Sequence, residues 1–145
     1  MELKIRKIKE EETEYIEIGC HKRDDRINEI VRLVKMHHGS VEAYQEDTQY
    51  QIPLSEIYYI EAVDEKTFIY LEKECYESRK RLYEFEELLA NRKFARISKS
   101  VVVNMMKIVA IKPALNGRFI CQLKNNEDVI ISRKYVPEIK EKIKR

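Results

Sequence analysis

The sequence lacks tryptophan and is poor in glycine, proline and cysteine, with three of each in 145 residues. The glycines stand far apart, so no glycine-rich loop is present to hold a nucleotide phosphate. No apolar run approaches the roughly 20 residues that a membrane-spanning helix needs. The segment Met1–Lys7 has no long apolar stretch and no small-residue cleavage site, so we expect no signal peptide. These absences favour a soluble cytoplasmic protein.

Cysteine and histidine are too scattered to suggest a metal centre or a catalytic site. The cysteines are odd in number and far apart, which is typical of reduced, partly buried thiols in a cytoplasmic protein. The histidines all precede residue 45, and with Cys20 their spacing matches no usual zinc pattern. Glu61 and Asp64 are poorly spaced for a catalytic pair, and no serine or cysteine has an evident base nearby. We therefore expect no enzyme activity, no cofactor, no metal and no small-molecule substrate. The residues concerned are Cys20, Cys75, Cys121, His21, His37 and His38.

Charge is distributed unevenly along the chain. The overall net charge is +2. Residues 1–90 hold 14 Lys and Arg against 22 Asp and Glu, a net charge of −8, whereas residues 91–145 hold 14 against 4, a net charge of +10. Such a difference between halves suggests that the C-terminal part faces a polyanion. The alternative is that the basic part pairs with the acidic part inside the fold.

The N-terminal residues predict two strands. Apolar residues recur over residues 3–8 and 15–18, and the acidic run Glu10–Glu12 separates them as a turn. A polar stretch at residues 40–50 predicts a linker.

Between these two parts the sequence predicts a helix over residues 26–38. Asp24 or Asp25 can cap its start, and Gly39 suits the left-handed position that ends it. Residues 1–44 would then form a small β-β-α extension. A unit of this size is expected to dock on the remaining chain or to mediate dimerisation.

From residue 50 onward the sequence is rich in short strands separated by polar turns. Asn116-Gly117 and Asn125-Asn126 mark hairpins, and Pro53 restricts its run to an edge strand or a short piece. Ser78 can cap one helix, and Pro137 fits the first turn of a last helix. The first helix has an apolar stripe of Leu82, Phe85, Leu88 and Leu89. The expected strands lie at 52–54, 57–61, 67–71, 74–78, 94–97, 101–104, 108–113, 118–123 and 129–131. The predicted fold class is α+β, mainly antiparallel β.

The segment Phe94–Asn104 is the most informative about function. A cluster of cations and hydroxyls lies between apolar anchors, on a tight connection between two extended pieces. Such side chains bind phosphate oxygens and reach base edges. The cluster consists of Arg96, Ser98, Lys99 and Ser100.

Residues 50–145 resemble the LytTR family of DNA-binding domains. The family pattern Phe-x-Arg-x-His-Arg-Ser-x-x-Val-Asn matches Phe94–Asn104. Further agreements follow the family order at Ile57–Ala62, Leu82–Glu86, Asn116–Arg118 and Ile131–Tyr135. The resemblance implies a domain over residues 45–145 with several small antiparallel sheets and flanking helices.

In that family DNA is contacted by loops that enter successive major grooves from one side, instead of by a recognition helix. The resemblance assigns this role to three loops, at Asp64–Thr67, Ser98–Ser100 and Ser132–Lys134. The implied DNA-binding residues are Lys66, Thr67, Arg96, Ser98, Lys99, Ser100, Arg133 and Lys134. The residues expected to support the loops from behind are Asn104, Ser132 and Tyr135.

Several of these residues have a second interpretation. Arg96 either faces DNA or pairs with a carboxylate such as Glu86. Lys66 can be an ordinary turn lysine. The hydroxyl of Ser132 can bind phosphate or cap the last helix, and we favour the cap.

One departure from the family pattern concerns base reading. The usual His-Arg is Ser98-Lys99 in this sequence. Lysine keeps the positive charge and loses the planar fork of arginine, so base discrimination at this position should be less geometric.

We therefore expect a cytoplasmic bacterial transcription regulator that binds direct repeats in double-stranded DNA as a homodimer. Residues 1–44 are too few for the receiver domain that often precedes LytTR domains, so phosphorylation by a histidine kinase is not expected. Stand-alone family members of this size resemble regulators encoded beside a small membrane protein, which would be a further partner. The alternative function is a protein-interaction module whose basic C-terminal face binds an acidic partner or a membrane surface.

Overall fold

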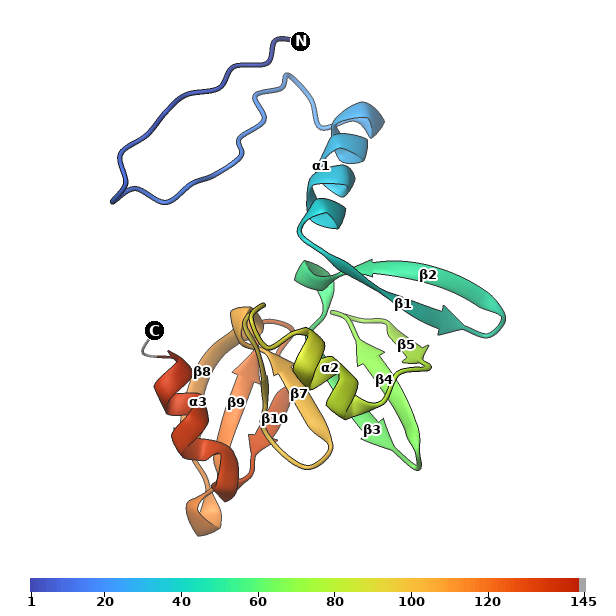
Figure 1. The fold of residues 1–145 in the computed structure, drawn as a ribbon, viewed down its shortest axis with the longest axis vertical. Coiled ribbons are helices and arrows are strands. Elements are labelled where there is room, and N and C mark those ends of the chain that lie inside the picture. The colour runs from blue at the N-terminus through green and yellow to red at the C-terminus, as the bar shows by residue number, and fades with distance from the viewer. Residues whose placement is uncertain (144–145) are drawn as a thin grey trace.

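Two antiparallel sheets form the body of the protein in a computed structural model that describes residues 1–143 (Figure 1). The larger sheet has seven strands in the order β2-β1-β5-β4-β3-β7-β6, and the smaller has the order β10-β9-β8. The expected α+β class with mainly antiparallel strands is confirmed. The strands are β1 Ser40–Gln45, β2 Thr48–Pro53, β3 Tyr59–Val63, β4 Lys66–Tyr70, β5 Cys75–Ser78, β6 Phe94–Arg96, β7 Val101–Asn104, β8 Ile108–Pro113, β9 Phe119–Leu123 and β10 Asp128–Ile131. The helices are α1 Asp25–His37, α2 Leu82–Leu88 and α3 Val136–Ile143.

The two strands predicted at residues 3–8 and 15–18 are wrong. Residues 1–24 contain a turn, in which Glu12 N donates to Lys9 O at 3.1 Å, and otherwise form an open loop that stands away from the body (Figure 1). A two-stranded hairpin is marginal in water unless a further layer covers its apolar face. The predicted helix is confirmed, since α1 begins after Asp24, whose side chain accepts a hydrogen bond from Ile27 N at 3.1 Å.

The linker predicted at residues 40–50 is also wrong. These residues form most of the hairpin β1–β2, and β1 joins the large sheet by pairing Tyr44 with Glu77 on β5. The hairpin forms because Val41 and Ala43 alternate inward among polar residues. The boundary that we placed between residues 44 and 45 therefore falls inside β1. The edge position expected for Pro53 is confirmed, because it ends the edge strand β2.

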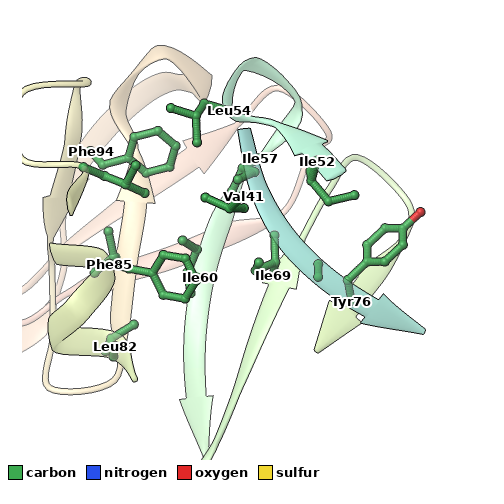
Figure 2. Packing of buried hydrophobic residues seen from close by; sticks show 13 residues of the cluster. Val41, Ile52, Leu54, Ile57, Ile60, Ile69, Tyr76, Leu82, Phe85 and Phe94 are labelled. Atoms are coloured by element: carbon green, nitrogen blue, oxygen red, sulfur yellow. The ribbon is translucent and has the colours of Figure 1, made fainter. Parts of the chain in front are cut away.

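The protein has two hydrophobic cores, one on each side of strand β7. The first lies between α2 and the large sheet, where Figure 2 shows Phe85 pointing toward Ile60. The second lies between β6 and β7 on one side and the small sheet with α3 on the other. Val102 belongs to the first core, whereas Val101 and Val103 belong to the second. Since successive strand residues face opposite sides, β7 is buried on both faces.

The helices differ from the sequence expectation in their details. Ser78 does not cap α2, because it lies on β5 with its hydroxyl accepting from Lys80 N at 3.1 Å. The turn into α2 is instead held by Arg81 N, which donates to the Glu84 carboxylate at 2.7 Å. Leu88 is exposed, although the other members of the expected stripe are buried. Pro137 does lie in the first turn of α3, as predicted.

The three cysteines are unbridged. Cys20 and Cys75 are exposed, so the expectation of partial burial is wrong for them, and Cys121 is fully buried in the second core. Burial raises the pKa of the Cys121 thiol to about 11. No helix within residues 1–143 is long and apolar enough to cross a membrane.

Asn104 connects strand β7 to the structure around it. Its side chain is buried, donates from Nδ2 to Ile57 O at 2.8 Å, and accepts from Met106 N at 3.0 Å. Asn104→Ala should lower the free energy of unfolding by about 1–3 kcal/mol, because it leaves the buried Ile57 carbonyl and the part-buried Met106 amide without their partner. Urea denaturation measures this loss, with the exposed Gln122→Ala on β9 as control. Equal urea midpoints for the two variants would show that the hydrogen bonds of the Asn104 side chain do not stabilise the fold.

Candidate nucleic-acid interface

The three loops that the sequence singles out lie at one end of the body, the lower end in Figure 1. Two backbone hydrogen bonds hold them together. Ala62 N, beside the β3–β4 turn, donates to Ser100 O at 2.8 Å. Ser132 N, in front of α3, donates to Ile97 O at 2.8 Å. The β6–β7 loop is therefore bonded to a neighbouring loop on each side.

The β6–β7 loop presents Lys99 at its exposed tip. Ile97 N donates to Val101 O at 3.0 Å and closes the base of the loop. The Ser98 hydroxyl accepts from Ser100 N at 3.2 Å and lies 3.4 Å from the Ser100 hydroxyl. These bonds fix the backbone and leave the Lys99 side chain in solvent.

Arg96 determines the shape of this loop from inside. Its side chain is only 17% exposed and forms an ion pair with Glu86 at 3.1 Å. The same guanidinium donates from Nε to Ser98 O at 2.7 Å and from a terminal nitrogen to Lys99 O. The pairing with Glu86, one of the two interpretations of Arg96, is thus present in the structure.

A shallow hollow of about 380 Å³ lies between the β6–β7 loop and the start of α3. Hydroxyls and ammonium groups surround it, and Lys134 Nζ lies 5.7 Å from the centre of the Tyr135 ring. Its lining consists of Ser98, Lys99, Ser100, Ser132, Lys134 and Tyr135. The cap that we favoured for the Ser132 hydroxyl is wrong. Ser132 precedes the 3-10 turn Arg133–Tyr135, and its backbone, not its side chain, makes the hydrogen bonds of this corner.

The β3–β4 loop is the least basic of the three. Asp64 and Glu65 form its tip with φ of 50° and 67°, and Lys66 lies 4.0 Å from Glu77 with both side chains largely exposed. Thr67, expected to face DNA, is only 4% exposed. It points inward because β4 alternates, with Lys66 outside and Thr67 inside.

A fourth segment, the β8–β9 turn, also belongs to this end and was not among the expected contacts. Gly117 has φ of +76°, and a Cβ at this position would lie 2.9 Å from Cδ of Arg133. The Arg133 side chain therefore lies directly against Gly117. Arg118 follows with an exposed side chain whose Nε donates to Leu115 O at 3.2 Å. The one sequence signal was an arginine directly after an Asn-Gly turn in the basic half.

Most cations at this end have no acidic partner inside the described structure, the exceptions being Lys66 near Glu77 and the partly buried Arg96 near Glu86. Within residues 1–143, no ion pair engages Lys99, Arg118, Arg133 or Lys134. Of the ion pairs there, the one between Arg96 and Glu86 alone joins the acidic and basic parts of the sequence. Within the described residues, internal pairing therefore leaves most of the C-terminal positive charge uncompensated.

Comparison with known proteins places this arrangement in a family. A family model described as the LytTr DNA-binding domain matches residues 47–144. A solved LytTr DNA-binding domain from Bacillus cereus is 31% identical, covers 72% of this chain and 95% of that one, and superposes with a TM-score of 0.68.

Curated relatives agree with this match. The transcriptional regulatory protein YpdB of Escherichia coli K12 is 36% identical over 90 residues, which are 61% of this chain and 37% of that protein. An uncharacterized HTH-type transcriptional regulator of Staphylococcus aureus MSSA476 is 29% identical over 141 residues, which are 94% of each chain. The chain thus spans little more than a third of YpdB, and nearly all of the staphylococcal relative. On the family match and the fold together, the chain belongs to the LytTR DNA-binding domain family.

Proposed function

We propose that this protein is a sequence-specific transcription regulator that binds the DNA major groove through loops. The observation that carries the proposal is the set of unpaired cations on hydrogen-bonded loops at one end of the body. Membership of a DNA-binding family supports the same conclusion. Cations without internal partners release counterions from DNA when they bind phosphates, which drives association.

The side chains at this end divide into contact and positioning groups. Lys99, Arg133 and Lys134 are exposed and extend from the loops, so they reach phosphates or the O6 and N7 atoms of guanine. The Ser98 and Ser100 hydroxyls are half-buried beside them and suit phosphate oxygens. Arg96 and Asn104 position the loops and do not contact DNA, because their polar atoms already form hydrogen bonds with other residues of the protein.

The helices are poorly placed for groove binding. Ile139 of α3 is buried in the second core, and α2 covers the first core through Phe85. Within residues 1–143, no two α-helices follow one another without intervening strands, so a helix-turn-helix unit is not present there. This leaves the loops as the elements that enter DNA.

The proposal includes the cytoplasm as location and a homodimer on direct repeats as the bound form. Residues 1–44 lie outside the family match and are available for dimerisation or for contact with a small membrane protein. A protein-interaction module on the basic face is the competing function, and the charge-removal test below separates the two.

Removing single cations should weaken DNA binding strongly. Lys99→Ala and Arg133→Ala should each cost about 1–3 kcal/mol of binding free energy and reduce the slope of log affinity against log salt by about 1. Fluorescence anisotropy with a duplex selected by the wild-type protein from a random pool measures both quantities. Lys73→Ala, an exposed lysine in the β4–β5 turn, is the matched control. Unchanged affinity in both site variants would sink the DNA proposal.

Gly117 should control affinity through Arg133. In Gly117→Ala the new methyl group displaces the Arg133 side chain and strains a positive-φ residue by about 1–2 kcal/mol. Gly39→Ala carries similar strain at φ of +115°, away from the loops, and should destabilise the fold without weakening DNA binding. In an Arg133→Ala background, Gly117→Ala should cause no further loss of affinity. Full additivity of the two losses would show that Gly117 does not act through Arg133.

Lys99, at the tip of the β6–β7 loop, should discriminate weakly between bases at the position that it contacts. Lys99→Arg restores a planar fork that can bind guanine bidentately, so it should sharpen discrimination at one base position by about 1–3 kcal/mol. Selection from random DNA followed by sequencing, run in parallel for both proteins, measures the change. Identical base preferences would place Lys99 on the phosphate backbone.

A further inference from the structure

Residues 2–18, named here the N-terminal arm, contain the elements of a hairpin that is not closed. The turn bond between Lys9 and Glu12 places these two residues opposite each other. A side-chain hydrogen bond between Arg6 and Tyr15 belongs to the same antiparallel register. The two legs are thus aligned, although no ladder of backbone hydrogen bonds connects them.

This register sorts the side chains of the arm by chemistry. It sets Ile5 opposite Ile16, Leu3 opposite Ile18 and Lys7 opposite Glu14, and opposed residues share a face of a hairpin. The other face would carry mainly polar side chains, with Ile8 as its one aliphatic member, and consists of Lys4, Arg6, Ile8, Thr13, Tyr15 and Glu17. One face of the closed hairpin is therefore apolar at Leu3, Ile5, Ile16 and Ile18, and it ends in two opposite-charge pairs, Lys7 with Glu14 and Lys9 with Glu12.

Most of the apolar face is uncovered within residues 1–143, where only Ile18 is half-buried. Leu3 is 89%, Ile5 91% and Ile16 68% exposed, and both cores of the body are filled by residues after position 40. An uncovered hairpin face of this kind explains why the legs remain open. A covering layer would supply the missing burial.

The charges of the arm indicate what that layer is. The first leg, residues 2–9, holds Lys4, Arg6, Lys7 and Lys9 against Glu2. The second leg, residues 10–18, holds only acidic charges, which are Glu10, Glu11, Glu12, Glu14 and Glu17. An acidic or a basic partner surface would repel one of the legs. A second copy of the arm complements both, provided that the basic leg of one faces the acidic leg of the other.

We propose that the N-terminal arms of two copies close into hairpins by stacking their apolar faces. The two-fold axis runs along the strands, so each first leg lies over the second leg of the other copy. Ile5 then meets Ile16 of the second copy, and Lys7 meets Glu14. The inference deepens the homodimer proposed above and rests on it.

Charge exchange at one pair tests the arrangement without DNA. In a homodimer of Lys7→Glu, positions 7 and 14 of the two copies bring four carboxylates together. In a homodimer of Glu14→Lys, the same positions bring four ammonium groups together. Each variant alone should therefore dissociate. An equimolar mixture should form a heterodimer, because every facing pair is then opposite in charge. Lys4→Glu and Glu17→Lys exchange the same charges on the other face, and they should remain dimeric alone.

Sedimentation velocity on full-length protein at about 0.05 M salt, where screening is weak, reads out the oligomeric state. A second variant, Ile5→Ser with Ile16→Ser, should raise the dimer dissociation constant by roughly tenfold or more without changing the urea midpoint of the body. Leu33→Ser, on an exposed position of α1, is its control.

Three results would overturn the inference: a monomeric wild-type protein, dimers in both single-charge variants, or no heterodimer in the mixture. Affinity of the same arm variants for a single-site duplex is measured separately. Because the arm lies outside the binding loops, loss of the dimer with retained single-site affinity rejects nothing in the DNA proposal. Retained dimers without DNA affinity would reject the DNA proposal alone.

Discussion

The burial of strand β7 on both faces is the constraint on which the rest of the structure depends. Val102 packs under α2 while Val101 and Val103 pack toward the small sheet, so this one strand joins the two cores. Asn104 ends it with a buried hydrogen bond to Ile57 O. The β6–β7 loop is therefore anchored at its C-terminal end by a strand that packs into both cores. This packing limits the movement of the loop tip.

Strands that bury apolar residues within the body could be predicted from the sequence, because their pattern is local. Strand β1 and most of β2 escaped prediction, although the strand expected at 52–54 overlaps the end of β2, since their buried residues are few and their polar residues resemble those of a loop. For the N-terminal arm the error was the opposite, because strands were predicted where none form. Its pattern is that of strands, but a pattern does not tell whether a second layer is present to cover the apolar face. Local sequence predicts the tendency to form a strand, whereas tertiary packing determines whether the strand forms.

The candidate site divides in a similar way. Residue order singled out Lys99 and the family resemblance pointed to Arg133 as expected contacts, and the structure leaves both side chains exposed. The roles of Arg96 and Thr67 depend on the direction in which each side chain points. Arg96 is turned toward the Glu86 carboxylate, and Thr67 points inward because side chains alternate along β4. The contact between Gly117 and Arg133 joins a turn and a loop that are distant in sequence, so no local pattern could reveal it. Composition and family resemblance pointed to this end of the body, and the fold distinguishes exposed side chains such as Lys99 from inward-facing ones such as Thr67.

The bond between Ser132 N and Ile97 O has a consequence for how the protein is made. A ribosome releases the acidic part of the chain first, including the β3–β4 loop, and releases the β6–β7 loop and the segment in front of α3 later. The β6–β7 loop emerges long before its neighbour in front of α3, and β10 must pair with β9 before that neighbour is in place. An incomplete chain thus carries Lys99 without the surface around it. We infer that a chain that ends before residue 132 presents Lys99 on a β6–β7 loop that lacks its hydrogen bond from Ser132 N.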